Sequence, residues 1–171
     1  MQFFRKHFVT VALVLVALAA IALILPRFFS NESNRVQEIE ITPQDIDFTR
    51  DGGVSIFKND SLIQTIEVEF AKNDEERALG LMYRSSMDEH QGMWFIFPEE
   101  APRSFYMRNT EIPLDIIYLD KDKKVVSIAK NARPYDETSL PSEKPAMYVL
   151  EINGGLSDKW GIEKGDRMEV K

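Results

Sequence analysis

The sequence predicts a mainly β fold: an antiparallel β-sandwich or barrel-like domain with one or two short helices, preceded by one N-terminal transmembrane or signal helix. Short apolar stretches recur after residue 60 with little helical periodicity between them, which is typical of such sheets. The first thirty residues contain a long run without formal charge. We therefore expect residues 1–30 to be a signal anchor or signal peptide, 31–60 a spacer with peripheral strands, and 61–171 a compact β-rich domain.

The N-terminal segment predicts where the domain is located. Residues 8–26 carry no formal charge and are long enough to cross a bilayer core as a helix. Arg5 and Lys6 precede this run, and that bias places the N-terminus in the cytoplasm and the domain outside it. The alternative is a cleaved signal peptide, because Ala17-Leu-Ala19 resembles a small-x-small cleavage site, and the product would then be secreted or periplasmic. Both interpretations export the domain.

Overall composition argues against several classes of protein. The 171 residues include 21 basic and 28 acidic residues and no cysteine. This acidic balance argues against nucleic acid as a partner, and the lack of cysteine excludes disulfides and a Cys nucleophile. His90 is the only histidine after residue 30 and lies in a polar stretch, so neither a Ser-His-Asp triad nor a zinc site is expected. We expect no cofactor and no metal.

After the spacer, the apolar pattern predicts each element in turn. Alternating apolar and polar residues predict a half-buried strand over 63–70. Asn73, with an acid three residues later at Glu76, predicts the start of a short helix that stops at Gly80. Gly154-Gly155 precedes a helical turn. Further strands are expected at 93–97, 104–107, 114–119, 125–129, 146–152 and 167–170.

Two acids in apolar strands are the main candidates for chemistry. Asp115 and Glu151 each lie in a strand that is otherwise apolar, so both side chains are expected to be buried. If the strands bring them together, they would form a general acid/base pair, because burial raises the pKa of one of them. If instead they accept hydrogen bonds from backbone N–H groups, or from Arg84 or Arg108, their role is structural. The structural role is the favoured reading.

The segment between these two strands offers further polar candidates. Asn109 and Thr110 precede Pro113, and side chains of these types satisfy backbone donors in rigid turns more often than they bind ligands. Residues 131–145 contain three prolines and form either a flap or a surface loop. The aromatic residues between Trp94 and Tyr106 are expected in the core, or along a groove for an apolar or sugar ligand if one face stays open.

Five ordered motifs give the sequence a family resemblance. They are Gly80-Leu-Met-Tyr-Arg84, Gly92-Met-Trp-Phe95, Phe105 to Thr110 with Ile112 to Asp115, Val149-Leu-Glu151 with Gly154-Gly155, and Ile162 to Asp166. Together they resemble the domain of unknown function 192 family (DUF192), over about residues 63–170. The resemblance implies a compact, mostly β domain without an established activity. Its signature positions correspond here to Arg84, Met107, Asn109, Thr110, Pro113, Leu114, Asp115 and Glu151.

The sequence therefore predicts a membrane-anchored, extracytoplasmic binding or interaction domain rather than an enzyme. Its partners would be the membrane, through the N-terminal helix, and a small molecule or an envelope protein. The candidate ligand-binding cluster is Arg84, Asn109, Thr110, Asp115 and Glu151. The alternative is an envelope hydrolase, for instance one acting on glycans, that uses Asp115 and Glu151 as a carboxylate pair. Carboxyl groups about 5 to 10 Å apart around an open cleft would favour it.

Overall fold

The structure is a computed structural model that describes residues 46–171. The predicted N-terminal helix and the first half of the spacer, residues 31–45 of 31–60, lie outside the described residues. Within the described part, no helix has the length and apolar character needed to cross a membrane.

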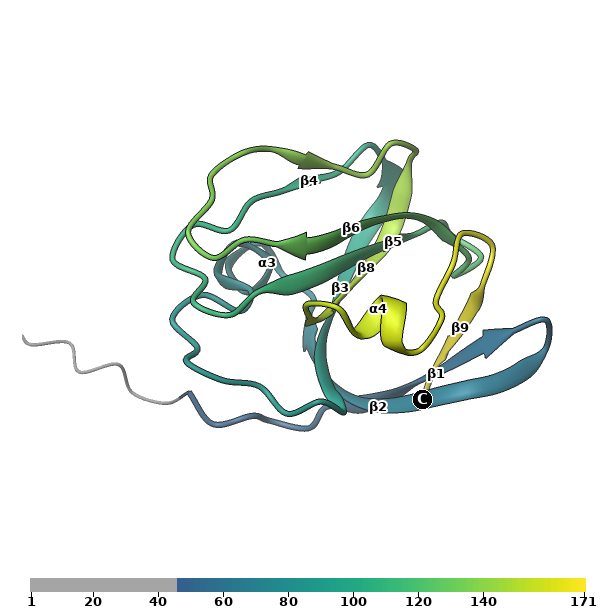
Figure 1. The fold of residues 1–171 in the computed structure, drawn as a ribbon. Coiled ribbons are helices and arrows are strands. Elements are labelled where there is room, and N and C mark those ends of the chain that lie inside the picture. The colour runs from purple at the N-terminus through teal and green to yellow at the C-terminus, as the bar shows by residue number, and fades with distance from the viewer. Residues whose placement is uncertain (1–45) are drawn as a thin grey trace, which may run out of the picture. The chain divides into compact units, whose positions relative to one another are not determined.

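Two short helices and nine strands make up the described chain. They are β1 (Gly52–Lys58), β2 (Ser61–Ala71), α3 (Asp74–Leu79), β3 (Gln91–Ala101), β4 (Ser104–Phe105), β5 (Leu114–Leu119), β6 (Val125–Ala132), β7 (Leu140–Pro141), β8 (Ala146–Asn153), α4 (Leu156–Lys159) and β9 (Arg167–Val170). Seven of the strands form one sheet in the order β6-β5-β8-β3-β2-β1-β9, while β4 and β7 form a separate two-stranded ribbon (Figure 1).

The large sheet curls into a half-barrel. Its neighbouring strands are antiparallel except for β2 and β3, which are parallel and are connected through α3. At one end the two edge strands meet, because Lys124 pairs with Arg167 and the Val125 amide donates to the Asp166 carbonyl at 2.9 Å. The predicted mainly β class with short helices is confirmed, and the sheet is a single curled layer rather than a two-sheet sandwich.

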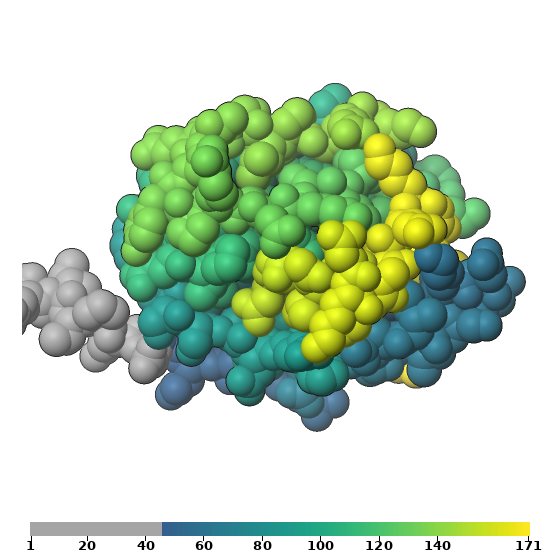
Figure 2. All heavy atoms as spheres, viewed as in Figure 1, coloured from purple at the N-terminus to yellow at the C-terminus, as the bar shows by residue number. Residues whose placement is uncertain are grey.

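The inner face of the curl carries the first apolar cluster. Trp94, Leu150 and Ile152 project onto this face from the central strands, and Leu156 of α4 packs against them. The C-terminal residues, with α4 and β9, occupy the opening of the curl (Figure 2). This face is therefore filled by the protein's own side chains.

The opposite face carries a second apolar cluster under the β4–β7 ribbon and the loops beside it. Phe95, Met107 and Val149 belong to it, with Phe105 and Leu140 from the ribbon packed against them. Strand β5 contributes to both clusters, and all six of its residues are buried. The prediction that both faces of this strand are covered is confirmed.

The short helix α3 begins and ends where the sequence predicts. The Asn73 side chain accepts a hydrogen bond from the Glu76 amide at 2.8 Å, and the Glu76 carboxylate accepts one from the Asn73 amide at 3.2 Å. This reciprocal capping box satisfies two amides that the first turn would leave unpaired. Gly80, with φ of 50°, ends the helix. The position of α3 matters because its last turn forms one wall of the candidate site.

Candidate functional site

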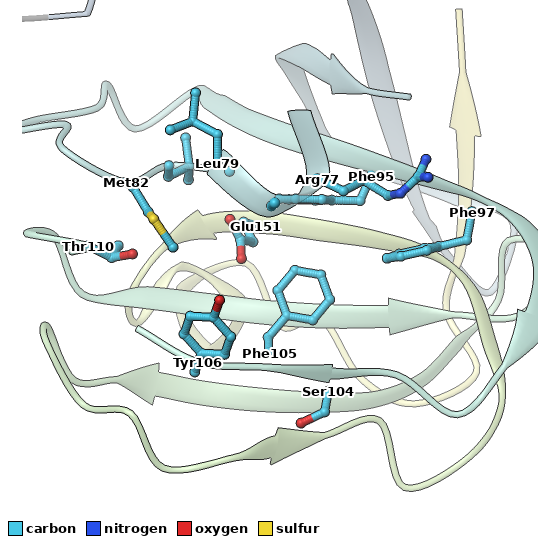
Figure 3. A pocket seen from close by; sticks show the side chains of 13 residues that line it. Arg77, Leu79, Met82, Phe95, Phe97, Ser104, Phe105, Tyr106, Thr110 and Glu151 are labelled. Carbon is cyan, nitrogen blue, oxygen red and sulfur yellow. The ribbon is translucent and has the colours of Figure 1, made fainter. Parts of the chain in front are cut away.

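A pocket of about 240 Å³ lies on the second face of the sheet, between α3 and the β4 segment. Residues 77–82 form one wall, from the end of α3 and the loop that follows. Ser104, Thr110 and Glu151 supply polar groups besides Arg77 and the hydroxyl of Tyr106. The remaining wall is aromatic and consists of Phe95, Phe97, Phe105 and Tyr106 (Figure 3). The pocket is thus an apolar recess with few polar groups, which is the usual composition of a small-molecule site.

The Glu151 carboxyl lies at the base of this pocket. Its strand β8 is central in the sheet, and only 5% of the residue is exposed. In Figure 3 the carboxyl points into the pocket, on the side of Phe105 and Tyr106. No group in residues 46–171 donates a hydrogen bond to it or forms an ion pair with it. Burial accordingly raises the pKa of Glu151 to about 8.

Gly80 keeps the recess open beside this acid. A β-carbon at this position would lie 3.4 Å from the ring of Phe95 and 3.9 Å from a carboxylate oxygen of Glu151. The positive φ of Gly80 is also strained for any residue with a side chain. The same glycine therefore ends α3 and leaves space in front of the carboxyl.

A second buried acid on the same face is fully partnered. Met93 on β3 pairs with Glu69 on β2 and with Glu151 on β8, and residues directly opposite in a sheet share a face. Glu69 forms a buried ion pair with Arg84 and accepts a hydrogen bond from the Thr49 amide at 2.6 Å. Arg84, a predicted site residue, therefore neutralises Glu69 and does not line the pocket.

Asp115 is held in a structural role on the inner face. The residue is fully buried. One carboxylate oxygen accepts a hydrogen bond from the Asn131 amide at 2.8 Å. The other accepts bonds from the Ser157 amide at 2.8 Å and the Ser157 hydroxyl at 2.6 Å. The side chain thus joins β5 to β6 and to the first turn of α4.

The predicted carboxylate pair is therefore wrong. Asp115 is directly opposite Ile152, while Glu151 is directly opposite Ile116. Because successive residues of a strand point to opposite faces, Asp115 projects to the inner face with Ile152, and Glu151 projects to the pocket face. The sheet separates the two acids, so they cannot act together as acid and base on one bound substrate.

Asn109 and Thr110 have different positions although they are adjacent. Asn109 adopts φ of 53°, and its side chain donates to the Tyr83 hydroxyl at 2.7 Å, while its carbonyl accepts from the Tyr83 amide at 2.8 Å. It braces two loops beside the pocket. Thr110 lines the pocket itself, and its hydroxyl donates to the Arg108 carbonyl at 3.2 Å. Of the five predicted site residues, the structure thus brings Thr110 and Glu151 together in the pocket.

The wall formed by residues 77–82 was not predicted from the sequence. The sequence does contain a relevant feature, because these residues join a capped helix to the motif that begins at Gly80. The apolar pattern, however, does not show which face of the sheet the loop covers. The expected groove of aromatic residues is partly found. Phe95 and Tyr106 line the pocket, whereas Trp94 lies in the opposite cluster. As for metals, the described residues contain no group of three or more potential ligands.

Comparisons with known proteins agree with this fold. The profile of the DUF192 family, described as an uncharacterized ACR, matches residues 54–170. A UPF0127 protein of Pyrococcus furiosus is 33% identical over 111 residues, which are 61% of this chain and 86% of that protein. A crystal structure of a protein of unknown function from Novosphingobium aromaticivorans is 43% identical with a TM-score of 0.66, covering 68% of this chain and 83% of that one.

A second solved structure is similar over a larger share of the chain. It is described as a candidate transcription regulator from Sinorhizobium meliloti. It is 33% identical with a TM-score of 0.69, covering 74% of this chain and 98% of that chain. Since the family profile matches residues 54–170, more than half of the chain and part or all of every strand from β1 to β9, the chain belongs to the DUF192 family.

Proposed function

We propose that this protein is a membrane-anchored, extracytoplasmic binding module whose small-molecule ligand occupies the pocket around Glu151. The observation that carries the proposal is the state of this side chain. Glu151 is 5% exposed, and its carboxyl has no hydrogen-bond or ion-pair partner among residues 46–171, which is costly to the folded protein. The carboxyl nevertheless faces a recess rather than packed side chains (Figure 3). Unpaired buried polar groups are uncommon, and a bound ligand would supply the missing partner.

Binding is favoured over catalysis by the composition of the pocket. General acid/base catalysis on a substrate normally uses a second positioned acid, base or nucleophile. In the described part of the lining, the other titratable groups are Arg77 and Tyr106. Arg77 donates to the carbonyl of Ile96 and pairs with Asp74. The pocket thus combines one acid with an apolar wall, an arrangement that suits recognition.

The proposed location rests on the sequence. The uncharged run at 8–26 follows Arg5 and Lys6, which supports an N-terminal anchor with the domain outside the cytoplasm. The similar Sinorhizobium meliloti protein is described as a candidate transcription regulator. We do not propose that role for this chain, because its formal net charge of −7 disfavours binding to nucleic acid.

A pair of tryptophan substitutions tests whether ligands bind in this pocket. Ala78 is exposed and lines the mouth of the pocket on α3, so Ala78→Trp should block it without disturbing the core. Glu75→Trp places the same side chain on the same helix, outside the lining. Small compounds with a phenyl body, measured by saturation-transfer NMR on the detergent-purified full-length chain, should bind the wild type and Glu75→Trp but not Ala78→Trp. Equal binding to both variants, or no binding to the wild type, would overturn the proposal.

A further inference from the structure

We propose that the ligand presents a protonated amine, an R–NH3+ group on a short apolar body, and that Glu151 is its counter-ion. This inference rests on the proposed function of the pocket and specifies the chemical class of its ligand. Three independent features of the lining support it: the missing cation, the aromatic wall, and the direction of the available hydrogen bonds.

The missing cation is evident from the comparison with Glu69. Both acids lie on the same face, on either side of Met93. Within residues 46–171, Arg84 pairs with Glu69 and no cation pairs with Glu151. A buried carboxylate is stable when a cation is placed against it, so the unpaired acid marks the position where a ligand's charge fits.

Arg77 does not serve as the missing cation. Although it lines the pocket, its guanidinium donates to the backbone carbonyls of Lys72 and Ile96 and pairs with Asp74. It also lies 5.3 Å from the centre of the Phe97 ring. These contacts hold the Arg77 charge at the rim, away from the carboxyl at the base.

The aromatic wall favours a positive charge and is already formed. Phe105 packs edge-on against Phe95 at 5.1 Å and against Phe97 at 6.4 Å between ring centres. Ring faces carry partial negative charge and attract ammonium groups, while they also accept an apolar body. The mutual packing fixes these rings before any ligand arrives, which lowers the entropic cost of binding.

The polar groups that remain offer mostly acceptors to a ligand, beside the Tyr106 hydroxyl, which can donate or accept (Figure 3). Once ionised, the Glu151 carboxylate accepts hydrogen bonds only. The Thr110 hydroxyl already donates its proton to the Arg108 carbonyl, so it can only accept a hydrogen bond from a ligand. An ammonium group supplies three donors to the ionised Glu151, whereas a carboxylate ligand beside the ionised Glu151 would add a second negative charge. The volume of about 240 Å³ is below the range of about 300–1,000 Å³ for drug-sized ligands, and so limits the body to a small group.

Protonation of Glu151 would be coupled to binding. The titratable groups around it are Tyr118 from β5, Tyr106 and Arg77 from the pocket lining (Figure 3), and the Glu69–Arg84 pair beyond Met93. Because burial keeps the carboxyl protonated in the empty pocket at neutral pH, an arriving ammonium group must displace that proton. Affinity should therefore rise about tenfold per pH unit up to about pH 8, with close to one proton released per ligand.

Calorimetric titration of the full-length chain, purified in a non-ionic detergent, tests the inference. Three probes share one body: 2-phenylethylamine, 2-phenylethanol and 3-phenylpropionate. At pH 8 the amine should bind about 10 to 100 times more tightly than the alcohol, as expected for a charge-assisted hydrogen bond, and the acid should bind least. Glu151→Gln should reduce amine affinity to that of the alcohol and abolish its pH dependence.

Each result has a separate meaning. If the alcohol binds as tightly as the amine and Ala78→Trp blocks both, the pocket binds ligands but the amine inference is overturned. If none of the three probes binds the wild type, the proposed function itself is overturned. Amine binding that persists in Ala78→Trp also contradicts the inference, because that binding lies elsewhere, for instance in the detergent.

Discussion

Glu69 and Glu151 lie on the same face of the sheet, on either side of Met93, and among residues 46–171 a cation pairs with Glu69 but not with Glu151. Both acids are almost fully buried, at 6% and 5% exposure. The charge of Glu69 is neutralised by Arg84 without any ligand, so the role of Glu69 is structural. Glu151 is instead left facing an aromatic pocket. We therefore expect the loss of Arg84 to lower the stability of the folded protein and the loss of the ionisable Glu151 carboxyl to raise it at neutral pH.

Removing the cation from the partnered acid should destabilise the protein strongly. Arg84→Met would leave the Glu69 carboxylate buried without its partner, which typically costs about 3–5 kcal/mol. Chemical denaturation monitored by tryptophan fluorescence measures the change. Arg50→Met is the matched control, because the Arg50–Glu67 pair is exposed and should contribute less than about 1 kcal/mol. A similar small effect for both variants would show that the buried pair is not structural.

Replacing Asp115 should reduce stability without a direct effect on the pocket. Asp115→Asn keeps the shape of the side chain but replaces one of its two acceptor oxygens by an NH2 donor, which then faces the amide of either Asn131 or Ser157. We expect a loss of about 1–3 kcal/mol in the free energy of unfolding. Asp122→Asn, an exposed acid in the turn before β6, should change stability by less than about 0.5 kcal/mol. Unchanged stability of Asp115→Asn would contradict the structural role.

Replacing Glu151 should have an effect that depends on pH. The pKa of this carboxyl is about 8 in the folded protein, against 4.5 for an ordinary glutamate. Below pH 4.5 the carboxyl is protonated in both folded and unfolded states, so it adds no pH dependence. Between pH 4.5 and 8 the unfolded state loses its proton and the folded state does not, so the wild type loses stability as pH rises.

Relative to the wild type, Glu151→Gln should therefore gain about 1.4 kcal/mol per pH unit across this window and nothing more above it. Denaturation at several values between pH 4 and 9 checks this, and Glu75→Gln, an exposed acid on α3, should show no such trend. A constant difference between Glu151→Gln and the wild type at all pH values would contradict the raised pKa.

The location of the domain can be tested with one introduced thiol. The natural chain has no cysteine, so Asp122→Cys gives a single exposed site. A membrane-impermeant maleimide should label this site in spheroplasts of the cells that express the protein. Deleting residues 1–30 should prevent labelling until the cells are lysed. Labelling of the full-length variant only after lysis would place the domain in the cytoplasm, against the proposal.

Local patterns in the sequence predicted much of the fold. The helix after Asn73 and the doubly buried strand at 114–119 follow from a capping box and from apolar residues on both faces. These features depend on neighbouring residues only. The half-barrel could not be predicted in the same way, because the bridge between Lys124, just before β6, and Arg167 of β9 joins distant parts of the chain.

The candidate site shows why pairing register limits inference from sequence. Burial of Asp115 and Glu151 could be predicted from their strands, but whether they share a face depends on register. Asp115 is opposite Ile152, so a shift of one residue would have placed it opposite Glu151 on the same face. No local pattern in either strand determines that register.

The pKa of Glu151, measured with and without an amine, tests the central claim most directly. NMR titration of glutamate carboxyl carbons in the full-length chain gives this value, and Glu151→Gln assigns the signal. The account predicts a pKa of about 8 in the free protein and a decrease of at least about one unit with saturating 2-phenylethylamine, since tenfold tighter binding to the ionised form corresponds to one unit. An ordinary pKa in the free protein, or a raised one that the bound amine leaves unchanged, would contradict it.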